Sequence, residues 1–134
     1  MLKVEHIGIA VNDINNSNHL FAKLFNTEPY KEEFVEAEQV KTSFFKVGDT
    51  KIELLEATTE NSPIHTFLQK RGEGIHHIAY EVADIEKEME RLKNEGFHLL
   101  AEKPKKGADN KLICFLHPKT TNGVLIELCQ EIKN

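Results

Sequence analysis

Cysteine is scarce in this sequence, and long apolar runs are missing. Among the 134 residues only Cys114 and Cys129 are cysteines, and they show no CxxC spacing. We therefore expect two reduced, half-buried thiols rather than a disulfide. No stretch reaches the roughly 18 consecutive apolar residues that a membrane helix needs, so we expect no membrane span.

Clusters of basic residues are also missing. The formal net charge is −5, and lysines are interspersed with glutamates. Nucleic acid is therefore not an expected partner, because phosphate binding needs clustered cations. The composition of 40% hydrophobic and 29% charged residues is typical of a folded globular protein. Residues 1–4 begin like a strand, without a secretory or transit pattern, so we expect a cytoplasmic protein or the mature form of an organellar one.

What the sequence does contain is an internal repeat. Residues 6–14 read HIGIAVNDI and residues 77–85 read HIAYEVADI, so each stretch starts with His and reaches Asp-Ile seven steps later. The alternation of apolar residues predicts a strand in both stretches, and Asp13 and Asp84 can each cap a following helix. Such self-similarity indicates two copies of one supersecondary unit.

Apolar residues at helical spacing follow each of these aspartates. In the first helix the stripe comprises Ile14, Leu20, Phe21, Leu24 and Phe25. In the second helix the stripe comprises Ile85, Met89 and Leu92, with Gly96 as a stop signal.

Strands follow each helix, so the order βαβββ occurs twice. The expected strands after the two helices are 29–36, 39–47 and 50–56, then 97–101, 111–117 and 123–130, with turns at 48–49 and 122–123. Ser62-Pro63 predicts a short helix to about residue 71 between the halves. We predict an α+β fold in a single domain over 1–134. Module one covers about 1–60, the linking helix about 62–71, and module two about 75–132. The two modules share one cupped, barrel-like mixed sheet.

Two residue types recur at equivalent places in the repeat and predict a metal site. His77 follows His6 by 71 residues, and Glu127 follows Glu53 by 74. Modules paired about a pseudo-twofold axis could bring these four side chains to one point. Two imidazoles and two carboxylates suit Co, Mn, Ni, Fe or Zn and leave coordination positions open for a substrate. The alternative is that both glutamates point outward into solvent, as alternate strand residues often do.

Several motifs resemble the glyoxalase/vicinal-oxygen-chelate superfamily and, within it, the methylmalonyl-CoA epimerases. They are the stretches VEHIGIAV (4–11), KIELLE (51–56), GEGIHHIA (72–79), PKKG (104–107), FLHPK (115–119) and GVLIEL (123–128). The resemblance covers nearly the whole chain. It implies paired βαβββ modules around a divalent metal bound by His6, Glu53, His77 and Glu127, with His76 as a structural neighbour. It also implies a homodimer.

The resemblance further implies a reaction. The expected activity interconverts (2R)- and (2S)-methylmalonyl-CoA through a metal-stabilised enolate, with Glu127 and Glu53 as the catalytic bases. Some family members carry a separate base glutamate where this chain has Thr42. Glu36 and Glu38 lie nearby in the sequence, but neither aligns with that position.

Other functions remain open from the residues alone. A glyoxalase I-type lactoylglutathione lyase would use the same metal ligands. An extradiol-type dioxygenase would use two histidines and one carboxylate around iron, and a metal-free binding or resistance protein would use no metal. An acyl-CoA partner would meet Lys105, Lys106 and Lys119 through its phosphates, unless these lysines form an ordinary solvated surface. Residues 107–110 are a candidate flexible loop over the site.

Overall fold

The computed structural model describes residues 1–133 and divides the chain into two compact units. The first unit is His6–His76, and the second unit combines Met1–Glu5 with the chain from His77 onward. Both units mix helix and strand, which confirms the α+β class. No helix within residues 1–133 has the length and apolar character needed to cross a bilayer.

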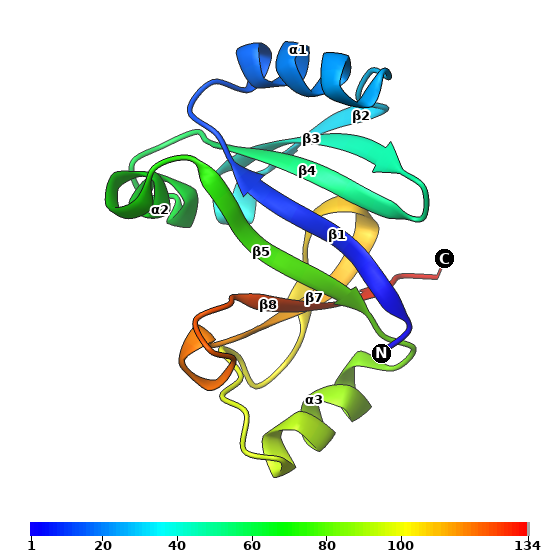
Figure 1. Cartoon of the computed structure of the whole chain (residues 1–134). Helices are drawn as coiled ribbons and strands as arrows, with labels where there is room; N and C mark the ends of the chain where they lie inside the picture. Colours follow the sequence, from blue (N-terminus) through cyan, green and yellow to red (C-terminus); the bar gives the residue numbers. More distant parts are fainter. Residues whose placement is uncertain (134) are drawn as a thin grey trace. The chain divides into compact units, whose positions relative to one another are not determined.

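The first unit has a four-stranded sheet in the order β2-β3-β4-β1, with β1 and β4 parallel and the other pairs antiparallel. Figure 1 shows β1 beside β4. Its elements are β1 (Lys3–Ala10, from His6 on), α1 (Ile14–Phe25), β2 (Lys31–Val35), η1 (Glu36–Glu38), β3 (Val40–Val47), β4 (Thr50–Ala57) and α2 (Pro63–Arg71).

The second unit repeats this arrangement, with the strand order β5-β8-β7-β6. Strands β5 and β8 are parallel, and the remaining pairs are antiparallel. Its elements are β5 (Gly74–Glu81, from His77 on), α3 (Ile85–Asn94), β6 (Lys105–Lys106), η2 (Ala108–Asn110), β7 (Lys111–Leu116), η3 (Pro118–Thr120) and β8 (Ile126–Glu131).

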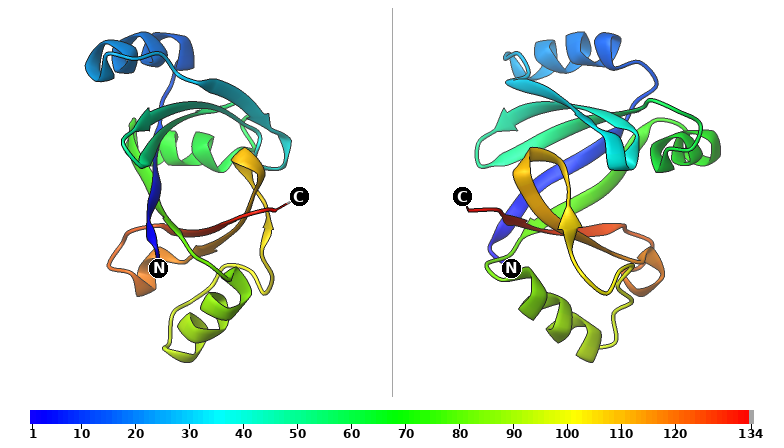
Figure 2. Two further views of the ribbon diagram at one scale, coloured as in Figure 1. Left: turned by 90° about the vertical axis from the view of Figure 1, so that its right-hand side faces the viewer. Right: turned by 180° about the vertical axis from the view of Figure 1, so that it is seen from behind.

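Helix α1 covers one face of the first unit's sheet, as both views of Figure 2 show. Ile14, Phe21 and Phe25 pack there against Phe45 and other strand residues. The predicted apolar stripe is wrong in one respect, because Leu20 and Leu24 are 60% and 68% exposed. With about 100° between successive residues, Leu20 and Leu24 point to the side of the helix rather than to the face on which Ile14, Phe21 and Phe25 lie.

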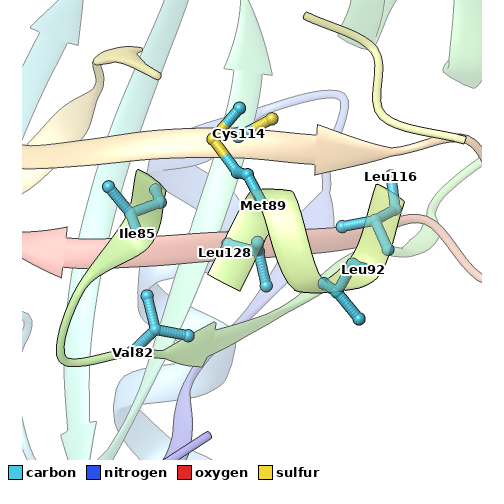
Figure 3. Packing of buried hydrophobic residues seen from close by; sticks show 7 residues of the cluster. All are labelled: Val82, Ile85, Met89, Leu92, Cys114, Leu116 and Leu128. Atoms are coloured by element: carbon cyan, nitrogen blue, oxygen red, sulfur yellow. The ribbon is translucent and has the colours of Figure 1, made fainter. Parts of the chain in front are cut away.

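Helix α3 packs on the second unit's sheet in the way the sequence predicts. Ile85, Met89 and Leu92 are buried, and Figure 3 shows them with strand residues of the same cluster, Cys114, Leu116 and Leu128. Gly96 follows the helix with a φ of 96°, a left-handed conformation that glycine adopts without strain.

The strand expected at 97–101 is wrong. Leu99 makes only an isolated bridge to Leu116, and pairing with β7 resumes at β6. Between these two contacts the five residues 100–104 face only two residues of β7, so the ladder cannot run on without a break; Pro104, which has no N–H to donate, lies in this stretch. The remaining predicted strands are confirmed with small shifts at their ends.

Candidate metal centre

Strand register places the repeated residues equivalently in the two units. Glu53 pairs in register with Gly8 across β4 and β1, and Glu127 pairs with Ala79 across β8 and β5. His6 lies two residues before Gly8 in β1, and His77 lies two residues before Ala79 in β5. Since side chains two residues apart on a strand point to the same face, each histidine shares a face of the sheet with its glutamate. This is the face opposite the helix, because α1 and α3 pack on the other side.

In the first unit, His6 and Glu53 contact each other directly. Nδ1 of His6 lies 3.1 Å from Oε2 of Glu53, and both side chains are nearly fully buried. Phe44 pairs with Glu53 across β3 and β4 and is itself fully buried. A buried carboxylate needs a counter-charge or hydrogen bonds, and His6 is one polar partner of Glu53.

The second unit repeats this pair. Nε2 of His77 lies 3.2 Å from Oε1 of Glu127, and both side chains are again nearly fully buried. Phe115 pairs with Glu127 across β7 and β8 and meets the His77 ring edge-on, with 5.7 Å between ring centroids. The alternative that both glutamates point outward into solvent is therefore wrong.

The geometry of each pair fits a divalent ion. Two ligands bound at right angles to one ion, each at about 2.1 Å, lie about 3 Å apart. The N–O separations of 3.1 Å and 3.2 Å match this spacing. An imidazole nitrogen and a carboxylate oxygen are also a donor set that Co, Mn, Ni, Fe and Zn accept. Each unit thus supplies half of the predicted ligand set in a suitable arrangement.

Comparison with known proteins identifies the family. The model of the Glyoxalase/Bleomycin resistance protein/Dioxygenase superfamily matches residues 5–115. The chain belongs to this superfamily. An ethylmalonyl-CoA/methylmalonyl-CoA epimerase of Cereibacter sphaeroides is 40% identical over 96% of this chain and 97% of its own length. A mitochondrial methylmalonyl-CoA epimerase of Dictyostelium discoideum is 39% identical over 94% and 76%.

A solved structure agrees with these relatives. A variant of Streptomyces coelicolor methylmalonyl-CoA epimerase in complex with 2-nitronate-propionyl-CoA has a TM-score of 0.94 and 32% identity. The match covers 98% of this chain and 95% of that one. Within the superfamily, the resemblance to the methylmalonyl-CoA epimerases is therefore confirmed.

Thr42 is the position that the sequence resemblance aligns with the base glutamate of some family members. It is 1% exposed and pairs with Leu55, one alternation step from Glu53 on the same face. Its hydroxyl cannot act as a base at neutral pH. Glu33 lies directly opposite Thr42 on β2, is half-buried, and forms an ion pair with Lys31 at 3.4 Å. Sequence reasoning considered Glu36 and Glu38 and missed Glu33, whose position depends on strand pairing.

A buried thiol, that of Cys129, lies close to Glu127. It occupies β8 on the same face as Glu127 and is fully buried with Ala79 and Ile113. Burial raises the pKa of its thiol strongly, and the negative charges of Glu127 and Glu5 raise it further. The protonated thiol lies 3.5 Å from the Tyr80 carbonyl oxygen, to which it donates a hydrogen bond. Both cysteines are free, as predicted, but they are almost fully buried rather than half-buried.

Other residues singled out from the sequence lie away from the pairs. His76 meets the Phe67 ring edge-on at 5.0 Å, which agrees with a structural role. Lys105, Lys106 and Lys119 are exposed on β6 and η3. Two buried charged residues were missed altogether, Glu5 in β1 and Lys111 at the start of β7.

Proposed function

We propose that this chain is a divalent-metal-dependent epimerase that interconverts (2R)- and (2S)-methylmalonyl-CoA. The observation that carries the proposal is the buried His–Glu pair that recurs in equivalent register in both units. The names of the curated relatives support the acyl-CoA substrate.

His6, Glu53, His77 and Glu127 would together hold one ion. The repeat supports this set, because each unit contributes one imidazole and one carboxylate at matching positions. An ion held by these four side chains would keep coordination positions free for a chelating substrate. The ion supplies Lewis acidity that stabilises negative charge on the thioester carbonyl oxygen of a 2-carboxyacyl thioester. Cobalt, manganese, nickel, iron and zinc all suit the donor set.

Proton transfer falls to the two glutamates. One carboxylate takes the proton from the carbon beside the thioester, and the electron pair moves onto the carbonyl oxygen to form an enolate. The other carboxylic acid returns a proton to the opposite face of that carbon. Glu127 and Glu53 come from equivalent strands of the repeat, which supports placing them on opposite sides of the substrate. Thr42 cannot replace either of them.

Exchange of solvent deuterium tests this function. The metal-loaded protein in deuterated water should incorporate deuterium at the substrate's C2 while it epimerises methylmalonyl-CoA, as followed by NMR. Glu53→Gln keeps an oxygen ligand but removes the base, so we expect epimerisation to fall about 10²- to 10⁴-fold. The matched control is Glu60→Gln, at an exposed position just after β4, which should behave like the wild type.

The outcomes separate the alternatives. Unchanged exchange and epimerisation in Glu53→Gln would remove Glu53 from the base role. If the wild-type protein exchanges nothing into methylmalonyl-CoA but isomerises the methylglyoxal–glutathione adduct, the chain is a lactoylglutathione lyase instead. A homodimer and a cytoplasmic location remain predictions beside this proposal.

A further inference from the structure

The loop 107–110 occupies the same place in the second module as residues 36–39 in the first. Each segment directly precedes a strand that pairs with the last strand of its module, and Lys111 corresponds to Val40 at the start of that pairing. Val40 is buried in an apolar cluster, so an aliphatic side chain satisfies this position. Lys111 is buried to the same degree, with an exposed fraction of 4%. The second module therefore places a charge where the first needs none.

The buried ammonium of Lys111 lies between the loop and the last strand. Its Nζ is 3.9 Å from Oδ2 of Asp109, in the loop, and 3.9 Å from Oε1 of Glu131, at the end of β8. Asp109 is largely shielded from water, whereas the Glu131 side chain is 67% exposed, so the attraction to Asp109 is screened less. The main electrostatic partner of the buried lysine is therefore a loop residue.

The backbone of the loop has a conformation that needs support from its surroundings. Asp109 and Asn110 have φ angles of 58° and 54°, so two successive residues are left-handed. Asp and Asn adopt this conformation more readily than most residues, but normally as single residues. Within residues 36–39 of the first module, Gln39 alone has a positive φ. A strained conformation persists only where its surroundings fix it, and such segments cluster at functional sites.

Close packing fixes the other end of the loop. A Cβ atom at Gly107 would lie 2.7 Å from Cδ1 of Ile113, so the glycine lets the backbone rest directly on this side chain. The Gly107 N–H also donates to the Lys111 carbonyl oxygen at 2.8 Å. Ile113 and Lys111 are two residues apart on β7 and therefore point to the same face. The loop folds back over that face of the strand.

That face also carries the buried pair of the second unit. Ile113 forms a buried cluster with Ala79, and Phe115 packs against this cluster. Ala79 is in register with Glu127, and the Phe115 ring meets the His77 ring edge-on at 5.7 Å. Ile113 therefore packs with the direct neighbours of both members of the pair. A loop that rests on Ile113 lies beside the groups that carry out the proposed chemistry.

We propose that Lys111 is a positioning residue, which holds the loop 107–110 as a wall of the acyl-CoA site. This inference rests on the proposed epimerase function and identifies the segment that confines the acyl group in the same site. Lys111 acts through Asp109. Without the ammonium this carboxylate loses its counter-charge, and the left-handed segment relaxes away from Ile113. The substrate then binds less tightly, while the metal ligands keep their places.

Kinetics of the metal-loaded protein separate this role from one in stability alone. Lys111→Met should raise the KM for methylmalonyl-CoA about 10-fold and change kcat less than about threefold. Its affinity for the metal ion, measured by calorimetry, should stay within about twofold of the wild type. Lys111→Arg should keep most of the substrate affinity, because it retains the cation. Lys93→Met, at an exposed position of α3, is the matched control and should behave like the wild type.

Two further variants reach the loop without a change at Lys111. Asp109→Asn removes the partner charge, and combining it with Lys111→Met should raise the KM no further than either change alone, since both break one ion pair. Gly107→Ala pushes the backbone away from Ile113 and should raise the KM by a similar factor with every charge intact. Gly107→Ala also provides the comparison if Lys111→Met does not fold.

Either of two results would overturn the role of Lys111. One is a lower melting temperature of Lys111→Met with an unchanged KM, which marks a purely structural residue. The other is additivity of Lys111→Met and Asp109→Asn, which shows that Lys111 does not act through Asp109.

The Kd for methylmalonyl-CoA from calorimetry distinguishes a failure of this role from a failure of the epimerase function. A Kd that rises in Lys111→Met, in a protein whose wild type exchanges no deuterium, would refute the epimerase function and leave the positioning role intact. Epimerisation with an unchanged KM in both Lys111→Met and Gly107→Ala would refute only the positioning role. A wild-type protein that does not bind methylmalonyl-CoA would refute both.

Discussion

At the scale of single residues, side chains that recur in the repeat can be found from the sequence, whereas a buried charge that does not recur cannot. The four predicted ligands could be found from the sequence because the same residue types recur at nearly constant offsets. Lys111 escaped that search because it differs from its repeat partner, Val40. Its burial depends on strand register, which a single sequence does not supply.

The two cysteines give a prediction at this scale. Burial raises the pKa of Cys114, and burial with neighbouring negative charge raises that of Cys129, so both thiols stay protonated in the folded protein near pH 8. A disulfide-exchange reagent at pH 8 should react slowly with the native protein and should titrate both thiols rapidly once guanidinium unfolds it. Rapid reaction of either thiol before unfolding would contradict this picture.

The sign of the linkage follows from the same shifts. The pKa of both thiols is higher in the folded than in the unfolded state. The neutral thiols therefore contribute their full stability below about pH 8.5, the ordinary pKa of a cysteine. That contribution is lost as the pH rises from there towards the folded-state values. The melting temperature should therefore fall above about pH 8.5, and replacing Cys129 by Ala should reduce the slope of that fall.

At the scale of elements, a hydrogen bond in each module joins the start of the helix to a side chain of the last strand. The Ile14 N–H donates to Oε2 of Glu56 at 2.8 Å, and the Ile85 N–H donates to Oε1 of Gln130 at 2.7 Å. The two acceptors occupy equivalent places of β4 and β8 and satisfy an N–H that a helix start leaves without an intrahelical partner. The sequence predicted the helices and their Asp caps, but these tethers join residues 42 and 45 positions apart. No local pattern could therefore reveal them.

Removing either tether should destabilise the protein. We expect Glu56→Ala and Gln130→Ala each to lower the free energy of unfolding by about 1–2 kcal/mol, because each leaves a part-buried N–H without its acceptor. Urea unfolding followed by circular dichroism measures this. Glu90→Ala, at an exposed position of α3, is the control and should change stability by less than about 0.5 kcal/mol. Variants as stable as the control would show that the tethers contribute nothing.

At the scale of the whole molecule, the repeat accounts for most of what could be predicted. Period and turn residues predicted the order βαβββ twice, and the register of β1 with β4 and β5 with β8 agrees with it. The strand expected at 97–101 failed where the pairing with β7 breaks between Leu99 and Lys105, so the two modules are equivalent in topology but not in every strand. The proposal that both His–Glu pairs serve one ion is therefore an inference from duplication, and metal stoichiometry is the property that distinguishes it from two separate sites.

One shared ion and two separate ions predict different titrations. If four ligands hold one ion, calorimetric titration of metal-free protein should give one ion per chain. His6→Ala and His77→Ala should then each weaken that single event by a similar factor, because either change removes one imidazole from the same set. Chelation should lower the melting temperature of the wild type, since the ion binds only the folded state. His19→Ala, on the exposed side of α1, should titrate like the wild type. Two ions per chain, with each variant losing one and keeping the other, would mean that the pairs act independently, and a chelating substrate would then meet one imidazole and one carboxylate instead of the full set.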